Sequence, residues 1–133
     1  MHGKTVHVYS KAKDGTKKLS ANFKVQEFAS KDGADPIFVS PELVELLQKI
    51  RNHFGCPVTI NSGYRTVKHN QAVGGATYSQ HQYGTAADIK VKGIQPADVA
   101  AYAETLLPNT GGIGIYNTFV HIDVRAAKSR WNG

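Results

Sequence analysis

The segment from Ser40 to Gly55 constrains the fold most, because it carries the signals of a complete amphipathic helix. Ser40 is a suitable N-cap, Pro41 suits the first helical position, and Glu42 places an acid in the first turn. Apolar side chains recur at helical spacing, at Leu43, Leu46, Leu47, Ile50 and Phe54. Gly55 is a typical terminating residue. The pattern predicts a helix over 41–54 that packs one face against a core.

The remaining patterns predict one more long helix and an antiparallel sheet. A second helix is expected from Pro96 to Leu107, and a short one from Thr66 to Val73 before an irregular loop over 76–84. Alternating or glycine-marked strands are expected at 57–61, 87–92, 111–116 and 119–125. Residues 1–18 predict an N-terminal arm or hairpin, with turn chemistry at 13–16. The fold class predicted is α+β: a single compact domain over 1–133, with a central antiparallel sheet and two main helices.

Length and net charge limit the number of domains and the kinds of partner that the chain can have. A chain of 133 residues with 41% hydrophobic content is large enough for one core. Its net charge is +6, which favours anionic partners, but the lysines are scattered and concentrated in the first third. An Arg-rich helix or an aromatic-interleaved basic stripe is missing, so a nucleic-acid partner is not expected.

The chain also lacks the sequence signals of membrane insertion and of an intrachain disulfide. No apolar run approaches the roughly 20 residues of a membrane helix, and the start of the chain does not resemble a signal peptide. Cys56 is the single cysteine. We therefore expect a monomer without membrane insertion that reaches any site outside a cytoplasm by a non-classical route.

The stretch from Ser79 to Asp88 carries the clearest chemistry. It places the imidazole of His81 on a loop and the carboxylate of Asp88 on the strand that follows, and both are zinc-ligand types. His121 lies on the polar face of a strand that is otherwise apolar. It is a plausible third ligand, which would leave one coordination position open.

These residues resemble a known family. The pattern Ser-x-His-x-x-Gly-x-Ala-x-Asp from Ser79 to Asp88, followed by His121 and Asp123 as His-x-Asp, resembles the D-alanyl-D-alanine carboxypeptidase family of zinc peptidases. That family includes vancomycin-resistance dipeptidases, phage endolysins and the hedgehog signalling fold. Further similarity to its small wall-hydrolase branch lies at 61–65, 73–75, 112–116 and 130–131. The resemblance covers the chain from Leu19 to the C-terminus.

The resemblance implies roles for particular residues. His81, Asp88 and His121 would bind Zn²⁺ in a surface cleft, and Arg65 and Ser79 would bind substrate. The implied activity is that of a zinc metallopeptidase, a D,D- or L,D-carboxypeptidase or endopeptidase. It would hydrolyse amide bonds in bacterial peptidoglycan stem peptides or cross-links by attack of metal-activated water. The bond cleaved is left open, and action at the bacterial cell wall after delivery by phage lysis or a virion is expected.

One position departs from the family pattern. Many members carry Glu or Asp three residues before the final histidine, where this chain has Thr118. Our prediction is that Asp123 is the catalytic base instead, since it lies two residues beyond His121 on the same strand face. Alternatively Asp123 orients His121, and the base is another carboxylate or is not required. The departure keeps open an alternative function, a non-catalytic zinc-containing wall-binding or phage structural module of the same fold.

Overall fold

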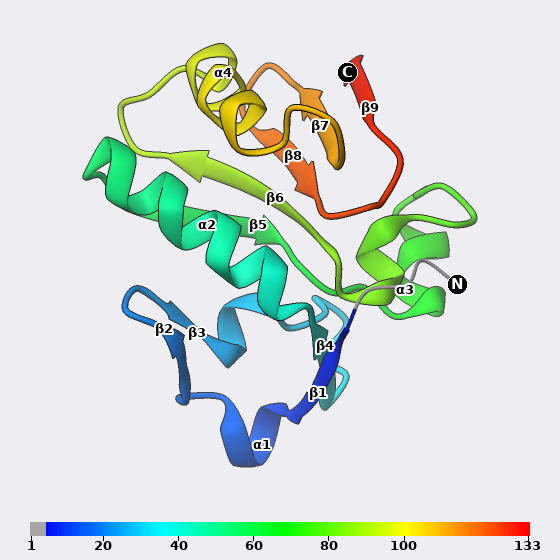
Figure 1. Cartoon of the computed structure of the whole chain (residues 1–133). Coiled ribbons are helices and arrows are strands. Elements are labelled where there is room, and N and C mark those ends of the chain that lie inside the picture. Colours follow the sequence, from blue (N-terminus) through cyan, green and yellow to red (C-terminus); the bar gives the residue numbers. More distant parts are fainter. Residues whose placement is uncertain (1–4) are drawn as a thin grey trace.

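A five-stranded sheet forms the centre of the computed structural model, which describes residues 5–133 (Figure 1). Its strands are β5 (Val58–Ser62), β6 (Ala86–Val91), β7 (Gly112–Ile115), β8 (Val120–Asp123) and β9 (Ser129–Asn132). Their order is β5-β6-β8-β7-β9, and every neighbouring pair is antiparallel except β7 and β9. The predicted antiparallel sheet is confirmed, with β9 added as an edge strand that the patterns did not predict.

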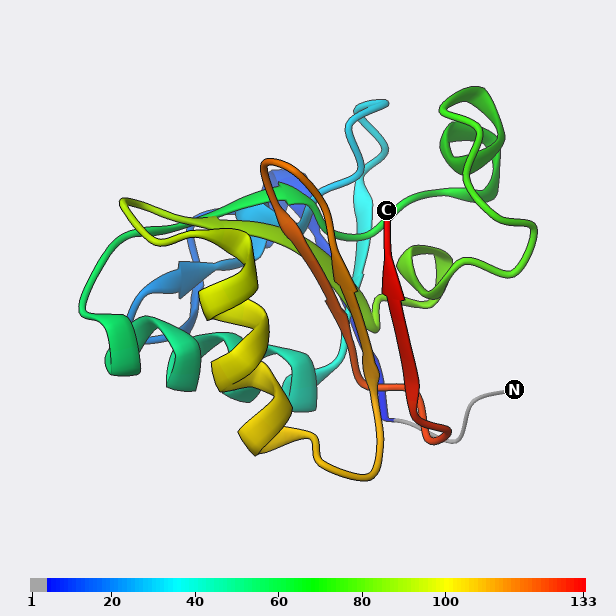
Figure 2. The ribbon, with the colours of Figure 1, turned by 90° about the horizontal axis from the view of Figure 1, so that it is seen from above.

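Two helices cover one face of this sheet. They are α2 (Pro41–Phe54) and α4 (Pro96–Leu106), and they lie on the same side of the strands (Figure 2). Leu43, Leu47 and Ile50 of α2 are at most 1% exposed and pack with the apolar side chains of β6 and β8. Gly55 ends α2 with a φ of +65°, as expected of a left-handed cap. The predicted α+β domain with two main helices is therefore confirmed.

The N-terminal region adds small elements beside α2. They are β1 (His7–Ser10), α1 (Lys11–Asp14), β2 (Lys18–Ser20), β3 (Phe23–Lys24), η1 (Val25–Phe28) and β4 (Pro36–Val39). β1 pairs with β4, and β2 pairs with β3. A local hairpin after β1 does not form, because Ser10 caps α1 by accepting a hydrogen bond from the Lys13 amide. Residues 1–4 of the predicted arm lie outside the described residues.

A lobe at one end of the sheet carries α3 (Val67–Ala72) and η2 (Gln80–Tyr83), as Figures 1 and 2 show. The predicted short helix is confirmed as α3, and the loop predicted over 76–84 contains the short 3-10 helix η2. Among the helices of residues 5–133, none is long and apolar enough to cross a membrane.

Replacing Leu47 tests the contribution of the α2 face to the core. Leu47 is fully buried, so Leu47→Ala should lower the free energy of unfolding by about 2–5 kcal/mol through lost burial and a cavity. Chemical denaturation measures the change. Lys49→Ala, at an exposed position of the same helix, should stay within about 0.5 kcal/mol of the wild type. A cost for Leu47→Ala no larger than that of the control would contradict the assignment.

Candidate metal centre

Three side chains from separate elements converge at one end of the sheet. His81 comes from η2, Asp88 from β6 and His121 from β8. One potential ligand atom from each lies within 4.8 Å of the other two, and all three residues are buried. The structure thus brings together the three metal ligands predicted from the sequence.

The position of His81 is set by the η2 turn. The hydroxyl of Ser79 caps η2 by accepting a hydrogen bond from the His81 amide at 3.2 Å. Gly84 ends the turn with a φ of +73°, and a Cβ there would overlap the backbone of Phe38. The ring atom Nδ1 lies 2.7 Å from the carbonyl oxygen of Gly63, which leaves Nε2 directed at Asp88. The glycine in this motif therefore serves the close approach of two chain segments.

Asp88 stands between the two imidazoles. Its Oδ1 lies 3.0 Å from Nδ1 of His121 and 3.3 Å from Nε2 of His81. The β6–β8 register places Asp88 directly opposite His121. Burial raises the pKa of Asp88, but hydrogen bonds from His121 and His81 outweigh it and hold this pKa well below its usual value. The carboxylate is therefore ionised, as a metal ligand must be.

The other nitrogen of His121 is occupied by Asp123. Nε2 lies 2.7 Å from Oδ2 of Asp123, on the opposite side of the ring from Asp88. Asp123 is fully buried and also accepts hydrogen bonds from the Gly112 amide and from the backbone and guanidinium of Arg125. Burial raises the pKa of Asp123, but the bonds with His121 and Arg125 prevail and lower it. An anionic acceptor thus fixes the orientation of the His121 ring.

His121 itself is polarised by two carboxylates. Burial lowers the pKa of its imidazole, whereas hydrogen bonds to Asp123 and Asp88 raise it, and the second effect prevails. The two carboxylates therefore hold the pKa of this imidazole above its usual value.

Two glycines of β7 make room for the site, and the sequence patterns indicated only strand packing there. A Cβ on Gly112 would overlap the Asp123 carboxylate, and one on Gly114 would overlap the ring of Trp131. The Trp131 ring lies 5.0 Å from that of His121, and its indole nitrogen donates to the Tyr116 hydroxyl at 2.9 Å. The sequence resemblance included Trp131 but implied no role for it. In the structure, Trp131 packs beside His121 at the edge of the candidate metal group.

Arg65, one of the two predicted substrate-binding residues, contacts the candidate metal group, and Ser79 caps the η2 turn that carries His81. Arg65 donates to Oδ2 of Asp88 at 3.4 Å, to Ser62 at 3.0 Å and to Asn70 at 3.2 Å. Asn70 is buried in α3 and also donates to the carbonyl of Ala76, so it ties the lobe to Arg65. Thr118 is exposed in the turn between β7 and β8. Sequence reasoning missed Asn70, because nothing distinguishes it from the other polar residues of the short helix α3.

The donor set fits zinc. Two imidazole nitrogens and one carboxylate oxygen are the ligand types of a catalytic zinc site with an open position. The outer atom of each side chain is already bonded: His81 to Gly63, Asp88 to Arg65 and His121 to Asp123. Such outer contacts fix the tautomer and direction of each ligand. The residues present can therefore hold a divalent metal without rearrangement of their supports.

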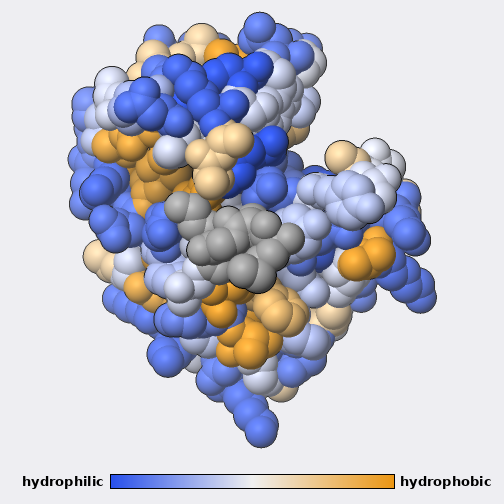
Figure 3. Space-filling model, turned by 45° about the vertical axis from the view of Figure 1, so that its right-hand side comes forward, coloured by the Kyte–Doolittle hydropathy of each residue, from blue (hydrophilic) through white to orange (hydrophobic). Residues whose placement is uncertain are grey.

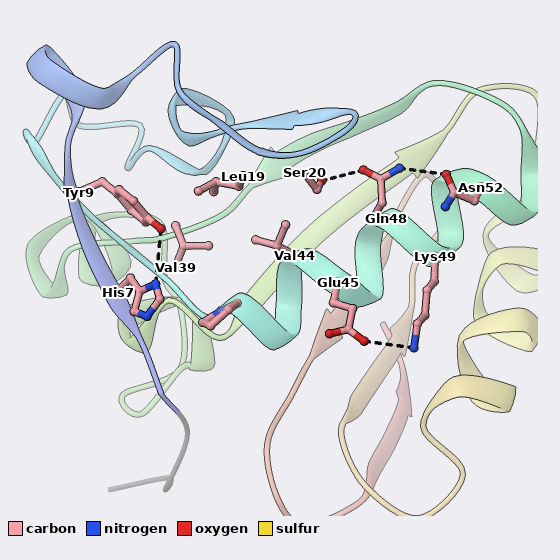
Figure 4. A pocket seen from close by; sticks show the side chains of 11 residues that line it. His7, Tyr9, Leu19, Ser20, Val39, Val44, Glu45, Gln48, Lys49 and Asn52 are labelled. Carbon is pink, nitrogen blue, oxygen red and sulfur yellow. Dashed lines mark hydrogen bonds and ion pairs between the residues drawn. The ribbon is translucent and has the colours of Figure 1, made fainter.

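The surface of the protein is hollowed at more than one place. Figure 3 shows the surface hollowed between the lobe that carries α3 and the upper part of the molecule. Another hollow, of about 450 Å³, lies between β1 and α2 (Figure 4). Its polar side chains are bonded to one another, Ser20 to Gln48, Gln48 to Asn52 and Glu45 to Lys49. That hollow therefore presents no convergent reactive group comparable to the metal centre.

Comparison with known proteins agrees with this site. The family described as Peptidase M15 matches residues 5–123. The chain is 31% identical over 99 residues to peptidoglycan L,D-endopeptidase MepK of Escherichia coli K12, covering 68% of this chain and 53% of that protein. It is 30% identical over 105 residues to a probable MepK of Haemophilus influenzae, covering 71% and 55%. A 44-residue segment is 50% identical to the zinc D-Ala-D-Ala carboxypeptidase of Streptomyces albus G, covering 32% and 17%. The chain spans about half the length of the two MepK relatives, and the match to the carboxypeptidase covers a smaller share of that protein.

Metal binding can be tested through stability. Added Zn²⁺ should raise the melting temperature of the wild type by several degrees, because a ligand at 100 times its Kd adds about 2.7 kcal/mol. Asp88→Asn, which removes an anionic ligand, should abolish this shift. The control Asp98→Asn changes an exposed acid in the first turn of α4 and should retain it. An equal shift in Asp88→Asn would place the metal elsewhere.

Proposed function

Because the chain belongs to the peptidase M15 family, we propose that it is a zinc-dependent peptidase that hydrolyses an amide bond in bacterial peptidoglycan stem peptides or cross-links. The observation that carries this proposal is the buried convergence of His81, Asp88 and His121, each oriented by an outer hydrogen bond. The zinc in the name of the Streptomyces relative and the peptidoglycan in the names of the MepK relatives support the metal and the substrate.

The metal supplies the electrophilic chemistry of this site. When bound, zinc lowers the pKa of a coordinated water toward about 7 and polarises the scissile carbonyl. The chain contributes the geometry. His81, Asp88 and His121 would hold the metal from three separate elements, η2, β6 and β8.

Arg65 is proposed to bind the substrate beside the metal. Its side chain is 17% exposed and is held by Ser62, Asn70 and Asp88. A guanidinium has five N–H donors, and the three bonds described leave two for a substrate oxygen. Arg65 would therefore hold the carbonyl or carboxylate of the peptide and stabilise negative charge that develops on it.

Ser79 is proposed as a second substrate contact. Its oxygen accepts from the His81 amide, and its hydroxyl hydrogen takes no part in that bond. The hydroxyl can donate to a substrate carbonyl while it holds η2 in place.

We propose that Asp123 is a positioning residue that acts through His121. Its carboxylate contacts the ring nitrogen opposite to Asp88, and Arg125 covers both of its oxygens. These contacts favour the orienting role over direct proton transfer at the open metal position. Asp123 would therefore raise the basicity of the ligand nitrogen and lock the ring against rotation.

One observation favours a second candidate function. With Asp123 bonded to the far side of His121 and Thr118 at the usual acidic position, the site resembles a metal centre without a dedicated base. A non-catalytic zinc-containing wall-binding module of the same fold would have this arrangement.

Digestion of purified peptidoglycan separates the two functions. The zinc-loaded protein should release peptides, chelation should reduce release to background, and added zinc should restore it. Mass spectrometry of the products identifies the bond. Binding to the wall without release of peptides, across walls of several compositions and with metal bound, would favour the non-catalytic module.

Asp123→Asn separates positioning from base catalysis. As a positioning residue, Asp123 contributes to metal affinity, so the variant should bind Zn²⁺ about 10–100 times more weakly and keep most of its kcat at saturating zinc. Competition with a chelator and steady-state kinetics measure both. Glu104→Gln alters a carboxylate bonded to Arg130 and should change neither. A loss of kcat at saturating zinc with unchanged affinity would identify Asp123 as the base.

A further inference from the structure

The metal centre lies on the face of the sheet that α2 and α4 leave open. Along β6 the side chains of Ala87, Ile89 and Val91 are buried in the core under the two helices. Asp88 and Lys90 alternate with them and project from the other face. Figure 2 shows both helices on one side of the strands. Lys90 therefore lies on the same face of β6 as Asp88, and Lys92 follows directly after the end of this strand.

A hollow of about 710 Å³ lies on this part of the sheet. Its lining includes Thr59, Asn61, Lys90 and Lys92. In the β5–β6 register Thr59 pairs with Lys90, and Ser62 pairs with Asp88. The strand rise of about 3.3 Å per residue puts the Cα atoms of Lys90 and Asp88 about 7 Å apart. The hollow therefore begins one side-chain row away from the metal ligands.

The hollow is positively charged. Lys90 and Lys92 are exposed, and neither forms an ion pair with another residue of the range 5–133. No Asp or Glu of that range lines the hollow. By contrast Lys49 and Lys128, elsewhere on the surface, are paired with Glu45 and Glu104. Two unpaired ammonium groups beside a metal centre attract an anion from the substrate that occupies it.

Two aromatic side chains, Tyr116 and Phe119, lie beside the neighbouring strand β8. The pairing of β6 with β8 ends at Ile89 and Val120, and Phe119 is the next residue outward from β8, on the side of Lys90. The Phe119 ring stacks on that of Tyr116, with centroids 4.4 Å apart. A ligand laid across these strands meets an apolar platform on one side of Lys90 and polar side chains of β5 on the other. This alternation suits a peptide with both methyl and carboxylate groups.

We propose that Lys90 and Lys92 form a subsite for a carboxylate of the peptide substrate, one row from the metal ligands on the open face of the sheet. The inference rests on the proposed peptidase function and assigns two side chains of this hollow to a carboxylate of that substrate. Arg65 forms an ion pair with Asp88 and so acts at the metal. The two lysines would instead select the part of the substrate peptide that lies farther from the metal.

The test compares two soluble stem peptides on the zinc-loaded enzyme. One carries its free carboxylates and the other has them converted to carboxamides. The double variant Lys90→Gln/Lys92→Gln should lower kcat/KM for the carboxylate peptide about three- to tenfold, mainly through KM, because the substrate carboxylate loses two exposed charge partners. It should leave kcat/KM for the amidated peptide unchanged. Lys18→Gln, at an exposed position of β2, should behave as the wild type with both.

The outcomes separate the two proposals. Cleavage of both peptides with equal kcat/KM, unaltered in the double variant, overturns the carboxylate subsite and leaves the peptidase function standing. An equal loss for both peptides also overturns it, because a structural role would not distinguish charge. Cleavage of neither peptide by the wild type, with zinc bound, overturns the peptidase function and the subsite together.

Discussion

The antiparallel pairing of β6 with β8 is the constraint on which the site depends. It places Asp88 directly opposite His121, so that a carboxylate and an imidazole meet across one strand pair. Side chains alternate along a strand, so a register slip of one residue would send Asp88 into the core and Ile89 to the metal side. The apolar residues between them, which α2 and α4 cover, therefore fix the register of the metal ligands as they build the core.

The surrounding contacts convert this pairing into a rigid centre. Asp123 and Gly63 hold the outer nitrogens of the two histidines, and Arg65 holds the outer oxygen of Asp88. Each of these supports comes from a different part of the chain. A glycine at 112 is needed because the Asp123 carboxylate fills the space of a Cβ. The energetic cost of burying two carboxylates is offset by their hydrogen bonds, which lower the pKa of both.

Local patterns predicted the parts of the fold that burial periodicity controls. The helix over 41–54 has its predicted bounds, and the strands that carry Asp88 and His121 were both expected. The pairing of β1 with β4 was not expected, because it joins strands that are far apart in the sequence, from His7 with Val39 to Ser10 with Pro36. Edge strand β9 was also missed. Its residues show no alternation, and it pairs with β7, where the Trp131 ring lies in the space that a Cβ on Gly114 would fill.

The sequence alone determined the α+β class, the main helices and the three residues that converge as the candidate metal group, because ligand chemistry and hydrophobic periodicity depend on residue type and spacing. Only the tertiary structure decided which nitrogen of His121 faces Asp88, and hence that Asp123 contacts the far side of the ring. It also decided that Lys90 and Lys92 lie near the candidate metal group, on the face of the sheet that the two helices do not cover. Side-chain direction and the choice of covered face depend on packing between distant segments, which residue spacing does not encode.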